Sequence, residues 1–180
     1  KIKNIKKLKV YEKVNFEKYN HFSLILNKLN GKNFCIDGNT CSINYKSIIR
    51  SKFKIIKNLD PCYELKAIKN KTELNNTKRA HIYDGAALTK FLYWIKNKKL
   101  NGISELSVEK KLESFRKKNK NFLYPSFNTI AGSGPNGAII HYRANKNSNR
   151  KINKKDIFLC DSGGQYKYGT TDVTRTICFS

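Results

Sequence analysis

Between Asn70 and about residue 115, the apolar residues of this 180-residue chain recur at helical spacing, and this period disappears after Pro125. Between Asn70 and Gly102 the spacing predicts one long helix, with Asn70 and Glu73 as a capping box and Gly102 as its end. Ser107 is predicted to cap a second helix. The apolar stripe of the long helix consists of Ile82, Leu88, Phe91, Leu92 and Ile95. The chain cannot be purely helical, because the segment after Pro125 needs another kind of element.

Two short runs of β-type residues follow Pro125, from Ile157 to Asp161 and from Thr171 to Phe179. Turn-forming residues separate them, so they predict an antiparallel hairpin. Two helices followed by a hairpin predict a mixed α/β (α+β) fold for residues 61–180.

Residues 1–60 form a separate predicted segment, which ends at the break Asp60-Pro61. Helices and strands alternate in it and predict an α/β layer. So small a sheet cannot stand alone, so we interpret residues 1–60 as the end of a larger domain. The expected elements are helices over 16–29 and 43–49 and strands over 33–37 and 53–57.

The charge of the chain is strongly positive, with 37 Lys and Arg against 13 Asp and Glu and a net charge of +24. Lysine is interleaved with Asn in every region. Proteins that recognise nucleic acids usually concentrate basic side chains on one face. The composition therefore predicts salt-sensitive, nonspecific attraction to polyanions and no specific recognition of nucleic acid.

The chain contains no Met and starts at Lys1, so we expect it to be a piece of a longer protein. No apolar run resembles a signal-peptide core or approaches the roughly 18 residues of a membrane span. These features predict a soluble, cytoplasmic protein that does not bind a membrane. The five cysteines lack zinc-ligand spacing, and we expect reduced thiols.

The predicted hairpin carries two carboxylates. If its turn has two residues and is centred on Tyr166-Lys167, Asp161 and Asp172 become direct cross-strand neighbours. Such a pair repels unless one acid is protonated or a cation lies between them. Three interpretations remain at this point: an acid/base dyad, a site for a divalent ion such as manganese, or two ordinary hairpin residues. His141 follows an apolar run, which by itself is typical of a core residue.

Four segments resemble, in chain order, the catalytic domain of the cytosolic aminopeptidase P family, the Xaa-Pro aminopeptidases among the pita-bread metallopeptidases. They are RAHIYDGAALTKFLYWI (79–95), ISELSVEKKLESFR (103–116), SFNTIAGSGPNGAIIHYRA (126–144) and DIFLCDSGGQYKYGTTDVTRTICF (156–179). The resemblance covers nearly all of residues 61–180. Residues 1–60 are similar to the end of the creatinase-like middle domain that precedes it. The implied domains are therefore the C-terminal part of a creatinase-like domain over 1–60 and the first half of a pita-bread domain over 61–180.

The resemblance implies a site with two divalent ions, usually Mn²⁺, with Zn²⁺ or Co²⁺ as alternatives. The family uses two Asp, one His and two Glu as ligands. By motif, Asp161 would bind one ion and Asp172 would bridge both, while His141 would be the catalytic residue that binds the substrate. The other three ligands would lie in the second half of the domain, so we expect this fragment to be inactive alone.

The implied reaction is hydrolysis of the bond between an N-terminal residue and a penultimate proline. Substrates would be peptides with proline at the second position, and the full-length protein would form a homodimer. Two other functions stay open: a non-catalytic pita-bread binding module and a basic polyanion-binding domain. The sequence beyond residue 180 would decide between the enzyme and the binding module, since only the enzyme needs the remaining His and Glu ligands.

Overall fold

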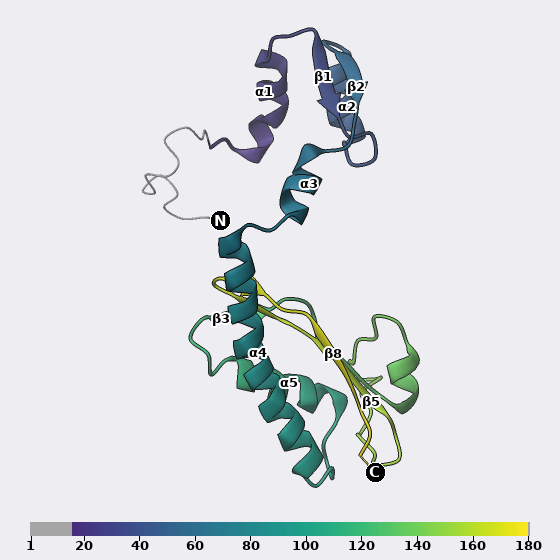
Figure 1. The fold of residues 1–180 in the computed structure, drawn as a ribbon. Helices are drawn as coiled ribbons and strands as arrows, with labels where there is room; N and C mark the ends of the chain where they lie inside the picture. The colour runs from purple at the N-terminus through teal and green to yellow at the C-terminus, as the bar shows by residue number, and fades with distance from the viewer. Residues whose placement is uncertain (1–15, 180) are drawn as a thin grey trace. The chain divides into compact units, whose positions relative to one another are not determined.

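The computed structural model describes residues 16–179 of the chain. It divides into two compact units, one ending at Ile68 and the other beginning at Lys69 (Figure 1). Both units contain helices and strands, which confirms the predicted mixed α/β fold class. The assignment of residues 1–60 to the end of a creatinase-like domain stays a prediction, and residues 1–15 lie outside the described part.

The first unit is a small α/β layer. Strands β1 (Asn33–Ile36) and β2 (Lys54–Lys57) pair in parallel, and helix α2 (Ile43–Arg50) connects them. Its other elements are η3 (Tyr19–His21), α1 (Phe22–Lys28) and α3 (Pro61–Ala67). The core consists of Leu26, Ile36, Ile49 and Phe53. The predicted alternation of helix and strand is confirmed.

Two details of this unit differ from the sequence prediction. The helix predicted over 16–29 begins only at Tyr19, as a 3-10 turn, and no side chain caps it. Phe16 and Tyr19 are both exposed, so neither of these two residues lies in the buried core of the unit. Helix α3 was not predicted, although Asp60 caps it through the backbone N–H of Cys62 and Pro61 occupies its first position.

The second unit contains two helices, α4 (Lys71–Asn97) and α5 (Glu105–Arg116). The predicted capping box is confirmed, since Asn70 Oδ1 accepts from Glu73 N at 2.9 Å and Glu73 Oε2 accepts from Asn70 N at 2.8 Å. Two boundaries were wrong. Helix α4 ends at Asn97, before Gly102, and α5 is capped by Ser104. Ser107 lies in its first turn and completes a capping box with Ser104.

The buried face of α4 also differs from the predicted stripe. Ile82 is 70% exposed, whereas Asp84 is 2% exposed and lies in line with Leu88 and Phe91. The buried stripe therefore includes an acidic residue, and its contacts are described below.

Two small antiparallel sheets complete the second unit. One has the order β3-β6-β7 and the other the order β4-β5-β8. The strand bounds are β3 (Phe122–Pro125), β4 (Ile130–Ser133), β5 (Phe158–Ser162), β6 (Gly164–Tyr166), β7 (Gly169–Thr170) and β8 (Val173–Ile177). Helices α4 and α5 lie side by side in Figure 1 and pack on one face of β4-β5-β8. The core between them includes Phe91, Ile95, Leu112, Phe158 and Ile177.

Glycines allow close approach at two places around these sheets. A Cβ at Gly132 would lie 2.7 Å from Gly137 Cα, so the 3-10 turn η4 (Gly134–Ala138) can lie directly on β4. A Cβ at Gly163 would overlap Thr171 O and Ser126 Oγ. Gly163 separates β5 from β6, so the hairpin passes from one sheet into the other at this residue.

Candidate metal and substrate site

The hairpin has a different register from the predicted one. Its two-residue turn is Lys167-Tyr168, since Tyr166 pairs with Gly169. Asp161 consequently pairs with Thr174 and not with Asp172. The turn begins one residue later because the Tyr166 side chain is buried and holds this residue in the strand.

The new register keeps the two carboxylates on one face of the hairpin. Asp172 lies between Thr171, which is buried, and Val173, which packs against the core under the helices. Side chains alternate along an extended chain, so Asp172 is directed away from the helices, as is Thr174. Asp161 pairs with Thr174 and shares its face. A slip of one residue in the pairing would have put the two acids on opposite faces. The observed partner of Asp161 differs from the predicted one by two residues, so both acids stay on the same face.

Asp161 and Asp172 are thus diagonal neighbours, for which the typical separation is about 7–8 Å. This spacing relieves the repulsion that direct pairing would impose, and it leaves room for an ion between the two side chains. Asp161 Oδ1 accepts a hydrogen bond from Thr174 Oγ1 at 2.8 Å. Asp161 is partly buried and Asp172 is exposed.

Neither acid forms an ion pair with a described residue, although the chain contains 37 Lys and Arg. Carboxylate oxygens without a cationic partner are the donors that hard and borderline divalent ions prefer. The two carboxylates are therefore suited to form part of the ligand set of a metal site. Within residues 16–179, no group of three or more His, Cys, Asp or Glu that could hold a metal ion occurs. At this face, the described part of the chain offers two carboxylates.

His141 lies at an exposed turn formed by residues 139–142. Tyr142 N donates to Ile139 O at 3.2 Å, and His141 has a φ of 54°. The left-handed region at the third position of a turn normally favours Gly or Asn. His141 is exposed, as are Ile139 and Ile140, so the interpretation of His141 as a core residue is wrong.

The turn that bears His141 follows η4, which packs on the face of the sheet that carries Asp161. Gly137 lies against Gly132 and Leu159, and Leu159 is two positions from Asp161 on the same strand. In the part of the chain that the structure describes, no hydrogen bond joins His141 to either acid. The structure brings the two acids to one face and places the histidine on a segment that covers part of it.

A buried ion pair lies behind the hairpin. Arg116 Nε and Nη2 donate to the two oxygens of Asp84 at 2.7 and 3.0 Å. Arg116 Nη2 also donates to Ser162 Oγ at 3.1 Å, and Tyr166 Oη donates to Asp84 at 2.8 Å. Burial, followed by the bond to Asp84, raises the pKa of Tyr166. This Asp84 cluster (Asp84, Arg116, Ser162, Tyr166) fastens α4 and α5 to the hairpin, next to Asp161.

A second buried acid, Glu105, lies at the start of α5 and is 0% exposed. It accepts from two backbone amides, Ser133 N and Arg150 N, each at 2.8 Å. It also accepts from Asn136 Nδ2 at 3.0 Å and from Tyr142 Oη at 2.8 Å. Burial is the main cause that raises the pKa of Tyr142. We call these five residues the Glu105 cluster.

The sequence reasoning missed both clusters, although the helical period contained a signal for them. Asp84 is spaced four residues before Leu88 in the buried stripe of α4. Glu105 and Arg116 share a face of α5 with Val108 and Leu112. A charged residue in an otherwise apolar stripe predicts a buried, paired charge.

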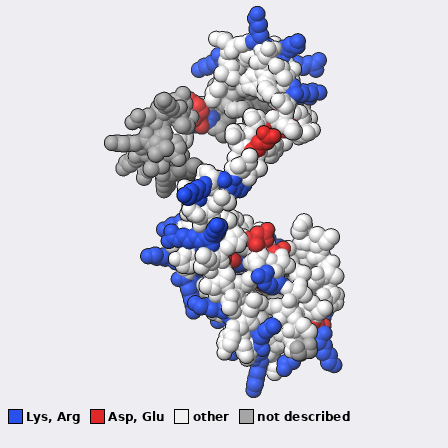
Figure 2. Space-filling view, viewed as in Figure 1, with Lys and Arg blue, Asp and Glu red and all other residues white. Residues whose placement is uncertain are grey.

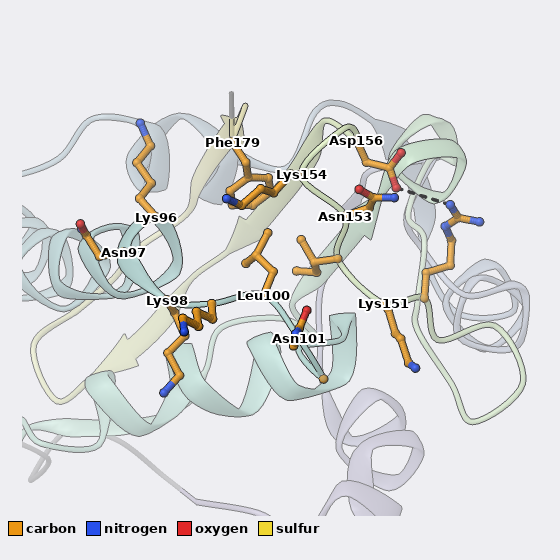
Figure 3. A pocket seen from close by; sticks show the side chains of 14 residues that line it. Lys96, Asn97, Lys98, Leu100, Asn101, Lys151, Asn153, Lys154, Asp156 and Phe179 are labelled. Carbon is orange, nitrogen blue, oxygen red and sulfur yellow. Dashed lines mark hydrogen bonds and ion pairs between the residues drawn. The ribbon is translucent and has the colours of Figure 1, made fainter.

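A pocket of about 920 Å³ lies between the end of α4 and the segment 150–156 (Figure 3). Its lining is basic, but Lys96, Lys98 and Lys151 point in different directions in Figure 3 and do not converge on one point. Its carboxylate, Asp156, pairs with Arg150 at 3.5 Å. The lining includes none of the candidate site residues, so this pocket is not the candidate metal site.

Three further features concern the charges, the thiols and the length of the helices. On the face shown in Figure 2, Lys and Arg side chains lie over both units. Cys35, Cys41, Cys62 and Cys160 carry free thiols. Among the described residues, the structure has no helix with the length and apolar character needed to cross a membrane.

Comparison with known proteins gives the following matches. The model of metallopeptidase family M24 matches residues 75–180. The chain is 46% identical over 137 residues to the Xaa-Pro aminopeptidase ApepP of Drosophila melanogaster, which covers 75% of this chain and 22% of the fly protein. It is 49% identical over 122 residues to a probable Xaa-Pro aminopeptidase P of Paracoccidioides lutzii, which covers 66% of this chain and 20% of the fungal protein. The chain thus spans about a fifth of the length of the curated relatives it matches.

Solved structures give the same result. The chain resembles an X-prolyl aminopeptidase of Caenorhabditis elegans, described as a cytosolic enzyme with a di-nuclear active site, with a TM-score of 0.66 and 34% identity. This match covers 74% of the chain and 22% of the nematode protein. A prolidase of Pyrococcus furiosus matches with a TM-score of 0.69 and 28% identity, over 91% of this chain and 46% of that protein. The comparisons confirm the resemblance and the fold class that the sequence predicts.

Proposed function

The chain belongs to metallopeptidase family M24, and on this premise we propose that the full-length protein is an Xaa-Pro aminopeptidase. It hydrolyses the bond between an N-terminal residue and a penultimate proline. The observation that carries the proposal is the pair of carboxylates, Asp161 and Asp172, which share one face of the hairpin without a cationic partner among the described residues. Relatives named Xaa-Pro aminopeptidase support it.

In this proposal the two acids are ligands of a dinuclear site. Asp161 would hold one ion and Asp172 would be shared by both, while the other ligands would come from the rest of the full-length protein. The bond from Thr174 to one oxygen of Asp161 fixes the orientation of the carboxylate and leaves the other oxygen available. When bound, the two ions polarise the scissile carbonyl and lower the pKa of the attacking water. Oxygen ligands favour Mn²⁺ in this role.

His141 is the proposed catalytic residue that binds the substrate. A bond to proline has no N–H, so a protein can form hydrogen bonds to this amide only at its carbonyl oxygen, which accepts them. An imidazole N–H can donate to that oxygen and hold it as negative charge develops there. The exposed turn leaves the ring of His141 accessible to a peptide.

Three further features belong to the proposal. The cytosolic location of the nematode relative supports a cytoplasmic enzyme. We expect a homodimer for the full-length protein. The 180-residue chain alone, with two of the proposed ligands, should be inactive, because metal affinity depends on how many charged ligands meet in one geometry.

The test compares two peptides that differ only at the second position, proline or alanine, as substrates of the purified full-length protein. We expect release of the first residue from the proline peptide, loss of this activity after treatment with a chelator and recovery on addition of Mn²⁺. A protein that binds the peptide without cleaving it, with or without metal, would contradict the proposal and favour a non-catalytic binding module.

A further inference from the structure

The segment between Ser133 and Arg150 is attached to the start of α5 through one buried carboxylate, in addition to the packing of η4 on β4. Ser133 N donates to Glu105 at the start of the segment, and Arg150 N donates to it at the end. Asn136 and Tyr142 donate to it from within. Four donors that are up to 17 positions apart in the sequence therefore meet at a single side chain.

The donors around Glu105 also contact one another. Asn136 Nδ2 lies 2.8 Å from Tyr142 Oη, and both lie within hydrogen-bond distance of Ser148 O, at 3.1 and 3.0 Å. Asn136 O accepts from Ile139 N at 3.3 Å. The residues before and after the turn that bears His141 are thus held at the same point.

The turn itself is exposed, whereas the residues that hold it are buried or partly buried. Ile140 is 86% exposed and Ile139 is 54% exposed, whereas Tyr142 is 6% exposed. His141 adopts a left-handed backbone conformation, which is unfavourable for a residue with a side chain and persists only where the surrounding contacts impose it. Tyr142, the next residue, is the one whose hydroxyl reaches Glu105.

We propose that Glu105 is a positioning residue, which holds His141 in its left-handed turn through Tyr142 and Asn136. This inference rests on the proposed function, because it assigns Glu105 a catalytic effect only through His141. It does not make Glu105 a metal ligand: all its donors are neutral protein groups, and its side chain is fully buried.

The test uses the metal-loaded full-length protein and four variants. Glu105→Gln keeps the shape of the side chain but places an amide group where donors converge. Tyr142→Phe removes one hydroxyl and serves if Glu105→Gln fails to fold. His141→Ala removes the imidazole. Glu113→Gln is the matched control, because Glu113 is on the same helix and pairs at the surface with Lys117.

The first readout is hydrogen exchange of backbone amides. Loss of hydrogen bonds to a charged acceptor should speed exchange in residues 134–150 by at least about tenfold in Glu105→Gln. Exchange in β5 and β8 should stay unchanged, and so should the metal content. Glu113→Gln should match the wild type. Unchanged exchange over 134–150 in both Glu105→Gln and Tyr142→Phe would overturn the inference.

The second readout is a double-mutant cycle on kcat/KM with an Xaa-Pro peptide. Misplacement of His141 should lower kcat/KM about 10- to 100-fold in Glu105→Gln. In a His141→Ala background the same substitution should change kcat/KM less than about threefold, because the group it positions is absent. An equal loss in both backgrounds would show a general structural role and overturn the inference.

The two proposals fail in different ways. A wild-type protein that does not cleave Xaa-Pro peptides contradicts the proposed function, and the exchange experiment then still decides whether Glu105 holds the turn. Cleavage by the wild type, together with full activity of His141→Ala, would contradict a role for both His141 and Glu105.

Discussion

Asp84 and Glu105 are both buried acids of the second unit, yet their charges are balanced in different ways. Asp84 is 2% exposed and faces the guanidinium of Arg116, which binds it through two nitrogens. Glu105 is 0% exposed and faces four neutral donors. Buried charge can thus be stabilised by one opposite charge or by several converging dipoles.

The way in which each charge is balanced corresponds to the elements that each acid holds together. The Asp84 cluster joins two helices to the hairpin, and a bidentate pair suits this because it fixes rigid elements in one orientation. The Glu105 cluster gathers a segment with little regular structure, in which two backbone amides and two neutral side chains are the donors. One acid supports the strand that bears Asp161, and the other supports the turn that bears His141.

The largest effect is expected for Arg116→Met in the full-length protein. It leaves Asp84 buried without its cation, which typically costs about 3–5 kcal/mol. Lys117→Met is the matched control, since Lys117 follows Arg116 in the sequence and its side chain is 64% exposed in its ion pair with Glu113. It should cost less than about 1 kcal/mol. Free energies of unfolding from urea titrations measure both values, and similar losses would contradict a buried pair at Asp84.

A smaller effect is expected for Glu105→Gln. It removes a buried charge that has no cation beside it, so no opposite charge is left unpaired, and the cost is the loss of bonds to a charged acceptor. We expect a loss of about 1.5–3 kcal/mol in the free energy of unfolding. A loss as large as that of Arg116→Met would mean that the two acids are balanced in the same way.

The smallest effect is expected for the stability at alkaline pH. It involves the two tyrosines that donate to these acids, Tyr142 to Glu105 and Tyr166 to Asp84. Burial and the acceptor acid raise the pKa values of Tyr142 and Tyr166 above 10. A raised pKa favours the protonated phenol in the folded state, so this stabilisation is present below pH 10 and is lost as the pH rises through the raised values. Burial of Cys160, which raises its pKa to about 12, adds to the same decline in every variant.

The measurement is the free energy of unfolding as a function of pH above 9. Tyr142→Phe and Tyr166→Phe should each reduce the slope of the alkaline decline. Tyr93→Phe, a substitution at a residue that is 73% exposed, serves as the control and should leave the slope unchanged. Slopes that are equal in all three variants would show that neither buried phenol contributes.

The sequence predicted those parts of the fold that depend on local patterns. The capping box of Asn70 and Glu73 was predicted correctly because all its donors and acceptors lie within four residues. The end of α4 was placed too late, since the helix stops at Asn97 without the expected glycine. Local signals tell where a helix can begin or end, and tertiary packing decides which of them is used.

The register of the hairpin could not be predicted from the turn alone. Lys167-Tyr168 and Tyr166-Lys167 are both compatible with a two-residue turn, and the choice depends on the bond of Tyr166 to Asp84, a residue 82 positions away. The face of the two aspartates was nevertheless predicted correctly, because the alternation of side chains survives a change of partner by two residues. The convergence of four donors on Glu105 depends on long-range contacts, which the sequence does not show. Its only indication in the sequence is a charged residue in the apolar stripe of α5.

The central claim, that Asp161 and Asp172 hold metal ions, is tested most directly by the metal content of the full-length protein. Elemental analysis should find two ions per chain in the wild type, as in a di-nuclear site. Asp161→Ala and Asp172→Ala should each contain one ion or fewer, because Asp172 is the proposed bridge and Asp161 a ligand of one ion. Asp156→Ala is the control, because Asp156 lies five residues before Asp161 and pairs with Arg150. This variant should still contain two ions. Two ions in all three variants would contradict the assignment of both aspartates.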